Sequence, residues 1–90
     1  MIEKEYKENM TKWNDLAYWL VNYIKACDFK IGSGFKAIKV QLKDGFYWVR
    51  FDTNRNIVKV FKCGFPSSEQ VLKGNFNEVK DYCYENRYDQ

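Results

Sequence analysis

The side chains with the clearest chemical use are aromatic rings and cations in one stretch, KDGFYWVRFD, residues 43–52. Four of its ten residues are aromatic, namely Phe46, Tyr47, Trp48 and Phe51. Exposed rings stack on unpaired bases or anchor protein interfaces, and a neighbouring arginine contacts phosphate or carboxylate groups. Because alternate residues of a strand point to opposite faces, these rings cannot all enter one core. Some of these rings must therefore lie on a second face, which contacts either another part of this chain or a binding partner.

Side chains for catalysis or metal binding are sparse. The 90-residue chain has no histidine, the residue most used for proton transfer near neutral pH. Its cysteines, Cys27, Cys63 and Cys83, are far apart and form no Cys-x-x-Cys pair, so a structural zinc site is not expected. The carboxylates are scattered, and no serine has a candidate base. We expect a protein that is not an enzyme and that uses no metal or cofactor.

The cysteine count and the first residues indicate a reducing compartment. Three widely spaced cysteines are typical of free thiols, and one disulfide with a spare thiol is the alternative. The N-terminal sequence MIEKEYKENMTKW is charged and lacks an apolar run of signal-peptide length. No segment approaches the roughly 18 apolar residues of a membrane span. We expect a cytoplasmic protein with no membrane association.

A long helix is expected at the N-terminus, over about residues 3–28. Apolar residues recur there alternately four and three positions apart, the spacing of one helix face. The stripe consists of Tyr6, Met10, Trp13, Ala17, Leu20, Ile24 and Cys27. Leu16 and Tyr23 widen it, so packing onto a sheet or another helix is favoured over a coiled coil. The sequence IGSG, residues 31–34, is interpreted as the end of the helix and a flexible turn.

Three antiparallel strands are predicted next, over about 35–43, 46–52 and 57–63. Asp44-Gly45 is a strong signal for a two-residue hairpin turn between the first two strands. The sequence TNRN, residues 53–56, supplies the second turn.

The last part of the chain contains one ambiguous segment and one helix. Residues 69–73 fit either a short fourth strand or a helical turn, and the strand is slightly favoured. A helix is predicted over about 76–87, because Asn75 and Glu78 have the spacing of a capping pair.

These elements predict one α+β domain over residues 1–90. A long N-terminal helix precedes a meandering antiparallel sheet of three or four strands, and a C-terminal helix follows. The order resembles that of double-stranded RNA-binding domains. The lysine-rich start of their last helix is replaced here by NFNEVKDY, and their glycine-histidine loop by Asp44-Gly45. No RNA-binding role is therefore transferred from them.

Turn lengths predict which side chains share each face of the sheet. A two-residue turn at Asp44-Gly45 places Lys39 opposite Arg50, and the second turn places Arg50 opposite Lys59. One face is then an apolar core of Ile38, Val40, Leu42, Tyr47, Val49, Phe51, Val58 and Val60. The other face carries the candidate binding residues Lys39, Gln41, Phe46, Trp48, Arg50, Lys59 and Phe61.

Two packings of this second face are open. If both helices pack on the apolar face, its cations and rings are exposed to a partner. Alternatively, the C-terminal helix covers it, with Phe76, Val79 and Tyr82 on Trp48 and Phe61. An exposed face would suit phosphates with stacked bases, or an acidic protein surface.

We expect a small non-catalytic binding protein that acts by contact with a protein partner. A short chain rich in aromatic residues and without catalytic groups is similar in type to many phage and mobile-element proteins. Those often inhibit or regulate host nucleic-acid machinery, as anti-CRISPR proteins do. The alternative function is direct binding of RNA or single-stranded DNA by the cationic-aromatic face. The net charge of +3 does not decide between them.

Overall fold

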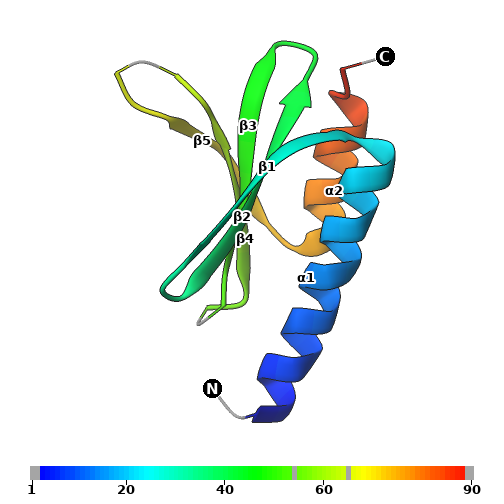
Figure 1. Cartoon of the computed structure of the whole chain (residues 1–90), viewed down its shortest axis with the longest axis vertical. Coiled ribbons are helices and arrows are strands. Elements are labelled where there is room, and N and C mark those ends of the chain that lie inside the picture. The colour runs from blue at the N-terminus through cyan, green and yellow to red at the C-terminus, as the bar shows by residue number, and fades with distance from the viewer. Residues whose placement is uncertain (1–2, 54, 65, 89–90) are drawn as a thin grey trace.

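The computed structural model of the chain describes residues 3–53, 55–64 and 66–88. Two helices and a five-stranded antiparallel sheet make up the fold, so the predicted α+β class is confirmed, with more strands than the predicted three or four. The elements are α1 (Glu3–Tyr23), β1 (Lys25–Gly32), β2 (Phe35–Leu42), β3 (Gly45–Asp52), β4 (Ile57–Lys62), β5 (Glu69–Gly74) and α2 (Phe76–Glu85). The strands lie in chain order from β1 at one edge to β5 at the other, and both helices lie on one side of the sheet (Figure 1).

The core forms between the helices and one face of the sheet. Trp13 and Leu16 of α1 are buried there, together with Val79 and Cys83 of α2. The ring of Trp13 stacks on that of Phe51 at a centroid distance of 5.6 Å. The sheet contributes Ile38, Val40, Leu42, Tyr47, Val49, Phe51, Val58 and Val60, which is the predicted apolar face.

The first helix is shorter than predicted. It ends at Tyr23, whose side chain is 63% exposed where the sequence predicted burial. The helical spacing continues past this end only by coincidence: Ile24 packs into the core from the connection, and Cys27 lies exposed in β1. The stripe from residue 10 to residue 20 does face the core, whereas the side chain of Tyr6 lies outside what the structure describes.

The strand β1 replaces the end of the predicted helix, and IGSG forms a hairpin. Gly32 pairs with Phe35, which leaves Ser33 and Gly34 as the two turn residues. Gly34 has φ 79°, a value that favours glycine. A Cβ at Gly32 would overlap the ring of Phe35, so glycine allows this ring to lie across the strand.

The C-terminal part follows the prediction. The segment for which a strand was favoured over a helical turn is β5, and α2 begins at Phe76 as predicted but ends at Glu85, two residues before the predicted end. The Asn75 side chain accepts a hydrogen bond of 2.9 Å from the Glu78 N–H, and the Glu78 carboxylate accepts one of 3.3 Å from the Asn75 N–H. This capping box satisfies two N–H groups that the first turn of a helix leaves unpaired.

The hairpin between β2 and β3 turns one residue earlier than predicted. Leu42 pairs with Gly45, so Lys43 and Asp44 form the turn. Gly45 has φ 140°, outside the range that a type I′ turn requires. The Asp44 carboxylate accepts a hydrogen bond of 2.9 Å from the Tyr47 hydroxyl, which holds the turn against β3. Each β2 residue therefore meets a β3 residue two positions earlier than predicted. An even shift leaves every side chain on its predicted face.

The pairing of β3 with β4 matches the prediction. Arg50 lies opposite Lys59 and Trp48 lies opposite Phe61. No helix in the described part of the chain is long and apolar enough to cross a bilayer.

Candidate binding surface on the open face of the sheet

Both α1 and α2 lie on one side of the sheet, and neither of them covers its opposite face (Figure 1). The alternative in which α2 covers Trp48 is wrong, because α2 packs on the core side. Its Phe76 ring lies 5.4 Å from the Phe51 ring, and its Tyr82 ring lies 6.3 Å from the Tyr47 ring.

We call this surface the open face and define it by the strand pairing, since directly paired residues share a face. Its residues from Asp28 onward that carry a side chain are Asp28, Lys30, Phe35, Ala37, Lys39, Gln41, Phe46, Trp48, Arg50, Asp52, Ile57, Lys59, Phe61, Gln70 and Lys73. Lys25 also pairs with Gln41, but it precedes the irregularity in β1 and its Nζ atom lies 4.9 Å from the centroid of the Tyr88 ring, so it is not included. All seven predicted site residues lie on the open face, and none of them is buried. Phe46 is the most exposed of its rings, at 42%.

A row of cations crosses the open face from one edge of the sheet to the other. Five directly paired positions make up this row, in the order Lys30, Ala37, Arg50, Lys59 and Lys73. With strands about 4.8 Å apart, the row is about 19 Å long. The predicted row was wrong at Lys39, because the two-position shift places this lysine opposite Trp48. Lys30 extends the row into β1, a strand that the sequence analysis does not predict. Lys73 extends it into β5, for which a strand and a helical turn were both considered.

A second row, made of one lysine and two aromatic rings, runs beside the cation row. Lys39, Trp48 and Phe61 are successive partners across β2, β3 and β4. The Lys39 Nζ atom lies 5.1 Å from the centroid of the Phe46 ring and 6.0 Å from that of Trp48. These distances are within the range of a cation–π interaction. The predicted juxtaposition of cations and rings is therefore present, with different direct neighbours.

Asp52 provides the carboxylate nearest to the centre of the cation row. Its Oδ1 atom lies 2.9 Å from Arg50 Nε, and its Oδ2 atom lies 3.4 Å from Lys59 Nζ. Partial burial acts to raise the pKa of Asp52, but the hydrogen bonds and charges of the two cations outweigh it and hold that pKa below its usual value. The ionised carboxylate relieves the repulsion between Arg50 and Lys59 across the strands. Among the residues that define the open face, five cations (Lys30, Lys39, Arg50, Lys59 and Lys73) and two acids (Asp28 and Asp52) give a formal charge of +3.

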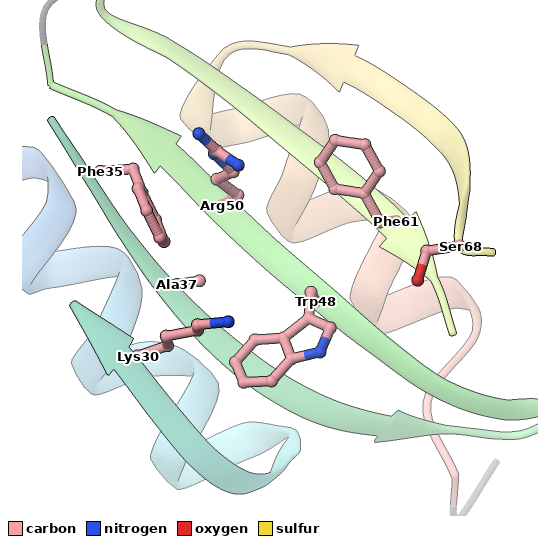
Figure 2. Close-up of a pocket in the computed structure, with 7 residues that line it drawn as sticks. All are labelled: Lys30, Phe35, Ala37, Trp48, Arg50, Phe61 and Ser68. Carbon is pink, nitrogen blue, oxygen red and sulfur yellow. The ribbon is translucent and has the colours of Figure 1, made fainter. Parts of the chain in front are cut away.

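The open face is hollowed into a pocket of about 300 Å³ (Figure 2). Its lining residues are Lys30, Phe35, Ala37, Trp48, Arg50, Phe61 and Ser68. Ala37 is the smallest of these and leaves room between the surrounding long and aromatic side chains (Figure 2). The guanidinium carbon of Arg50 lies 4.2 Å from the centroid of the Phe35 ring, so this cation is held at the edge of the hollow. The pocket thus combines flat apolar walls with two cations, Arg50 and Lys30.

Four open-face residues that line the pocket or belong to the cation row were not foreseen as site residues. Phe35 and Ala37 share the alternation of Lys39 along β2, so this periodicity could have identified them. Lys30 lies in the apolar/polar alternation of residues 27–31, which could have identified its strand, but the predicted helix was extended over it. The fourth, Lys73, lies in a strand whose partner in the sheet was not predicted.

The remaining polar chemistry of the described residues is limited. They contain no cluster of three or more His, Cys, Asp or Glu side chains placed to bind a metal ion. All three cysteines are free, so the disulfide alternative is wrong. Cys27 is exposed, whereas burial raises the pKa of the Cys83 thiol to about 12 and keeps it protonated at neutral pH.

No protein-family model, no curated protein and no solved structure gives a significant match to this chain.

Proposed function

We propose that this chain is a non-catalytic binding protein whose open face binds single-stranded RNA or DNA. The observation that supports this function is the row of four cations beside Trp48 and Phe61, on a face that neither α1 nor α2 covers. Phosphates would follow the cation row, and an unpaired base would enter the pocket and stack on its rings.

The charge distribution favours an anionic ligand. Among the described residues, Lys30, Lys39 and Lys73 take part in no ion pair, so their charges are available to a ligand. A single strand suits the rings better than a duplex does, because bases that are stacked and paired cannot present their flat faces to a protein.

Fluorescence anisotropy with labelled oligonucleotides tests this function. The probes are a mixed-sequence RNA and a DNA of about 12 nucleotides, within the range of single-strand binding sites, and the matching duplex. We expect the single strands to bind more tightly than the duplex, and the affinity to fall steeply between about 50 and 200 mM salt. Absence of single-strand binding at about 50 mM salt would overturn the proposal.

Matched variants locate the ligand on the molecule. Trp48→Ala removes a stacking platform worth about 1–3 kcal/mol per base, so affinity should fall by about 5- to 150-fold. Tyr18→Ala is the control, because Tyr18 is 74% exposed on α1. Lys39→Glu should weaken binding and reduce the salt dependence, whereas Lys12→Glu makes the same change of charge on the exposed surface of α1 and should have less effect.

A second function, inhibition or regulation of nucleic-acid machinery through protein contact, is favoured by the mixed charge of the open face. The carboxylates of Asp28 and Asp52 would repel phosphates but can pair with cations of a protein partner. Trp48 and Arg50 are residue types that dominate the energy of protein interfaces. In this function the chain would act as phage and mobile-element inhibitors of host machinery do.

Capture experiments distinguish the two functions. The immobilised chain would retain a specific protein from nuclease-treated extract, and Trp48→Ala would lose it while Tyr18→Ala would keep it. Such capture without oligonucleotide binding would favour the protein partner over the nucleic acid.

A further inference from the structure

The outer edge of β1 exposes both backbone groups and apolar side chains. Gly32 and Phe35 close a two-residue hairpin, so they form a hydrogen-bonded pair, and the alternation along β1 directs the backbone groups of Ile31 and Phe29 away from β2. The Phe29 N–H accordingly donates to the carboxylate of its neighbour Asp28, at 2.8 Å. The side chains of Phe29 and Ile31 are 60% and 77% exposed.

The opposite edge of the sheet is built differently. The strand β5 carries the polar residues Glu69, Gln70 and Lys73 and is interrupted by an irregularity in its pairing with β4. Charges and irregularities of this kind protect an edge from pairing with another strand. The strand β1 also has charges and one irregularity, but that irregularity lies between Ala26 and Asp28, before the regular residues 28–32. The two edges differ in their apolar side chains, since Val71 and Leu72 of β5 are half-buried. The hairpin of β1 and β2 instead reaches away from the helix layer, which leaves its edge accessible (Figure 1).

We propose that β1 pairs with β1 of a second copy of this chain, in antiparallel orientation, with Phe29 of each copy opposite Phe29 of the other. The two five-stranded sheets would then form one continuous sheet. The Phe29 N–H would exchange the Asp28 carboxylate for the Phe29 carbonyl of the second copy. The two open faces would meet edge to edge, with Lys30 at the seam.

Charge complementarity selects this register. When Phe29 is the centre, Asp28 of one copy lies opposite Lys30 of the other, on the same face, twice by symmetry. These two positions form non-hydrogen-bonded pairs, in which side chains approach most closely. A register centred on Lys30 would place two like charges opposite each other, and one centred on Ile31 would leave Asp28 without its cation.

The contact is small. Two eight-residue strands bury much less than the roughly 1,600 Å² of a standard protein interface. We therefore expect a dimer with a dissociation constant between about 10 μM and 1 mM, and the concentrations tested must cover that range.

Sedimentation equilibrium and NMR spectra of the full chain over this concentration range test the proposal. We expect a monomer–dimer equilibrium, with dilution-dependent amide shifts concentrated in residues 26–32. A monomer at about 1 mM would overturn the proposal, as would concentration-dependent shifts confined to the helices or to β5.

Charge reversal tests the register. Asp28→Lys and Lys30→Asp should each weaken the dimer at least about tenfold, because each places like charges opposite each other. The double variant D28K/K30D restores the opposite-charge pairs and should restore the affinity. Phe29→Lys should abolish association, whereas Tyr18→Lys, on exposed α1 surface, should not. Failure of the double variant to recover, with both single variants folded by circular dichroism, would overturn the register.

Discussion

Arg50 and Asp52 lie two residues apart on β3 and form an ion pair on the open face, with Arg50 Nε 2.9 Å from Asp52 Oδ1. The same carboxylate reaches Lys59 at 3.4 Å, while the Arg50 guanidinium rests on the ring of Phe35. Asp52 therefore controls both the position of these two cations and the charge that they offer a ligand. Its removal should affect binding and stability in opposite directions.

Asp52→Asn should strengthen binding of single-stranded nucleic acid at low salt. The substitution keeps the size of the side chain but frees the charges of Arg50 and Lys59 for phosphates. Each additional phosphate contact steepens the logarithmic salt dependence by up to about 0.7 for a single strand. Anisotropy titrations at several salt concentrations measure this slope. A weaker affinity with an unchanged slope would mean that Asp52 mainly positions Arg50, and would contradict the prediction.

The same carboxylate should contribute to acid unfolding. The pKa of Asp52 is lowered in the folded chain, below the value of about 3.9 typical of an unfolded chain. Its stabilising contribution is therefore complete above about pH 4 and is lost as the pH falls through the lower folded value. Urea midpoints measured between about pH 6 and pH 2 should decline less steeply in Asp52→Asn than in the unmodified chain. If the urea midpoints of the two chains fall in parallel with pH, the ion pair of Asp52 contributes no pH-dependent stability.

Filling the pocket should separate binding from folding. Ala37 lies opposite Arg50 and leaves space on the open face, so Ala37→Val would intrude into the pocket while keeping a residue type that strands favour. We expect a similar melting temperature and an affinity for single strands at least about fivefold lower, as loss of part of one stacking contact would give. Gln41→Val is the control, because Gln41 lies on the same strand and face and outside the pocket lining. Equal effects of the two variants would argue against the pocket as the base site.

The faces of the central sheet could be predicted from sequence, although the exact pairing could not. Because successive side chains of a strand point to opposite faces, Trp48 and Arg50 lie on one face and Val49 on the other, whatever the length of the turn. The turn itself depends on contacts that are distant in sequence, such as the hydrogen bond from the Lys43 N–H to the Asn86 carbonyl. The shift of two positions between β2 and β3 left every side chain on its predicted face, but it made Trp48 the partner of Lys39 in place of Arg50.

The strand β1 was not predicted, although Cys27, Phe29 and Ile31 alternate with Asp28 and Lys30 at the period of a strand. Ile24 and Cys27 also continue the helical spacing of the preceding residues, so the helix was extended over this alternation. A second signal was Ser33-Gly34, a dipeptide that marks turns. Its recognition would have placed Lys30 on the open face beside Ala37.

The rates at which the cysteine thiols are alkylated should depend on how α2 packs. Burial raises the pKa of the Cys83 thiol to about 12, and the thiolate is the reactive form, so Cys83 should resist alkylation in the folded chain. Cys27 is exposed and should react first when intact mass is followed at about pH 8. Val79→Ala removes a fully buried side chain from the same helix and should destabilise the chain by about 1–3 kcal/mol, which accelerates Cys83 labelling. Asn77→Ala, on the exposed side of α2, should leave the rate nearly unchanged. Equal rates for Cys27 and Cys83 in the unmodified chain would contradict the packing of α2 on the core.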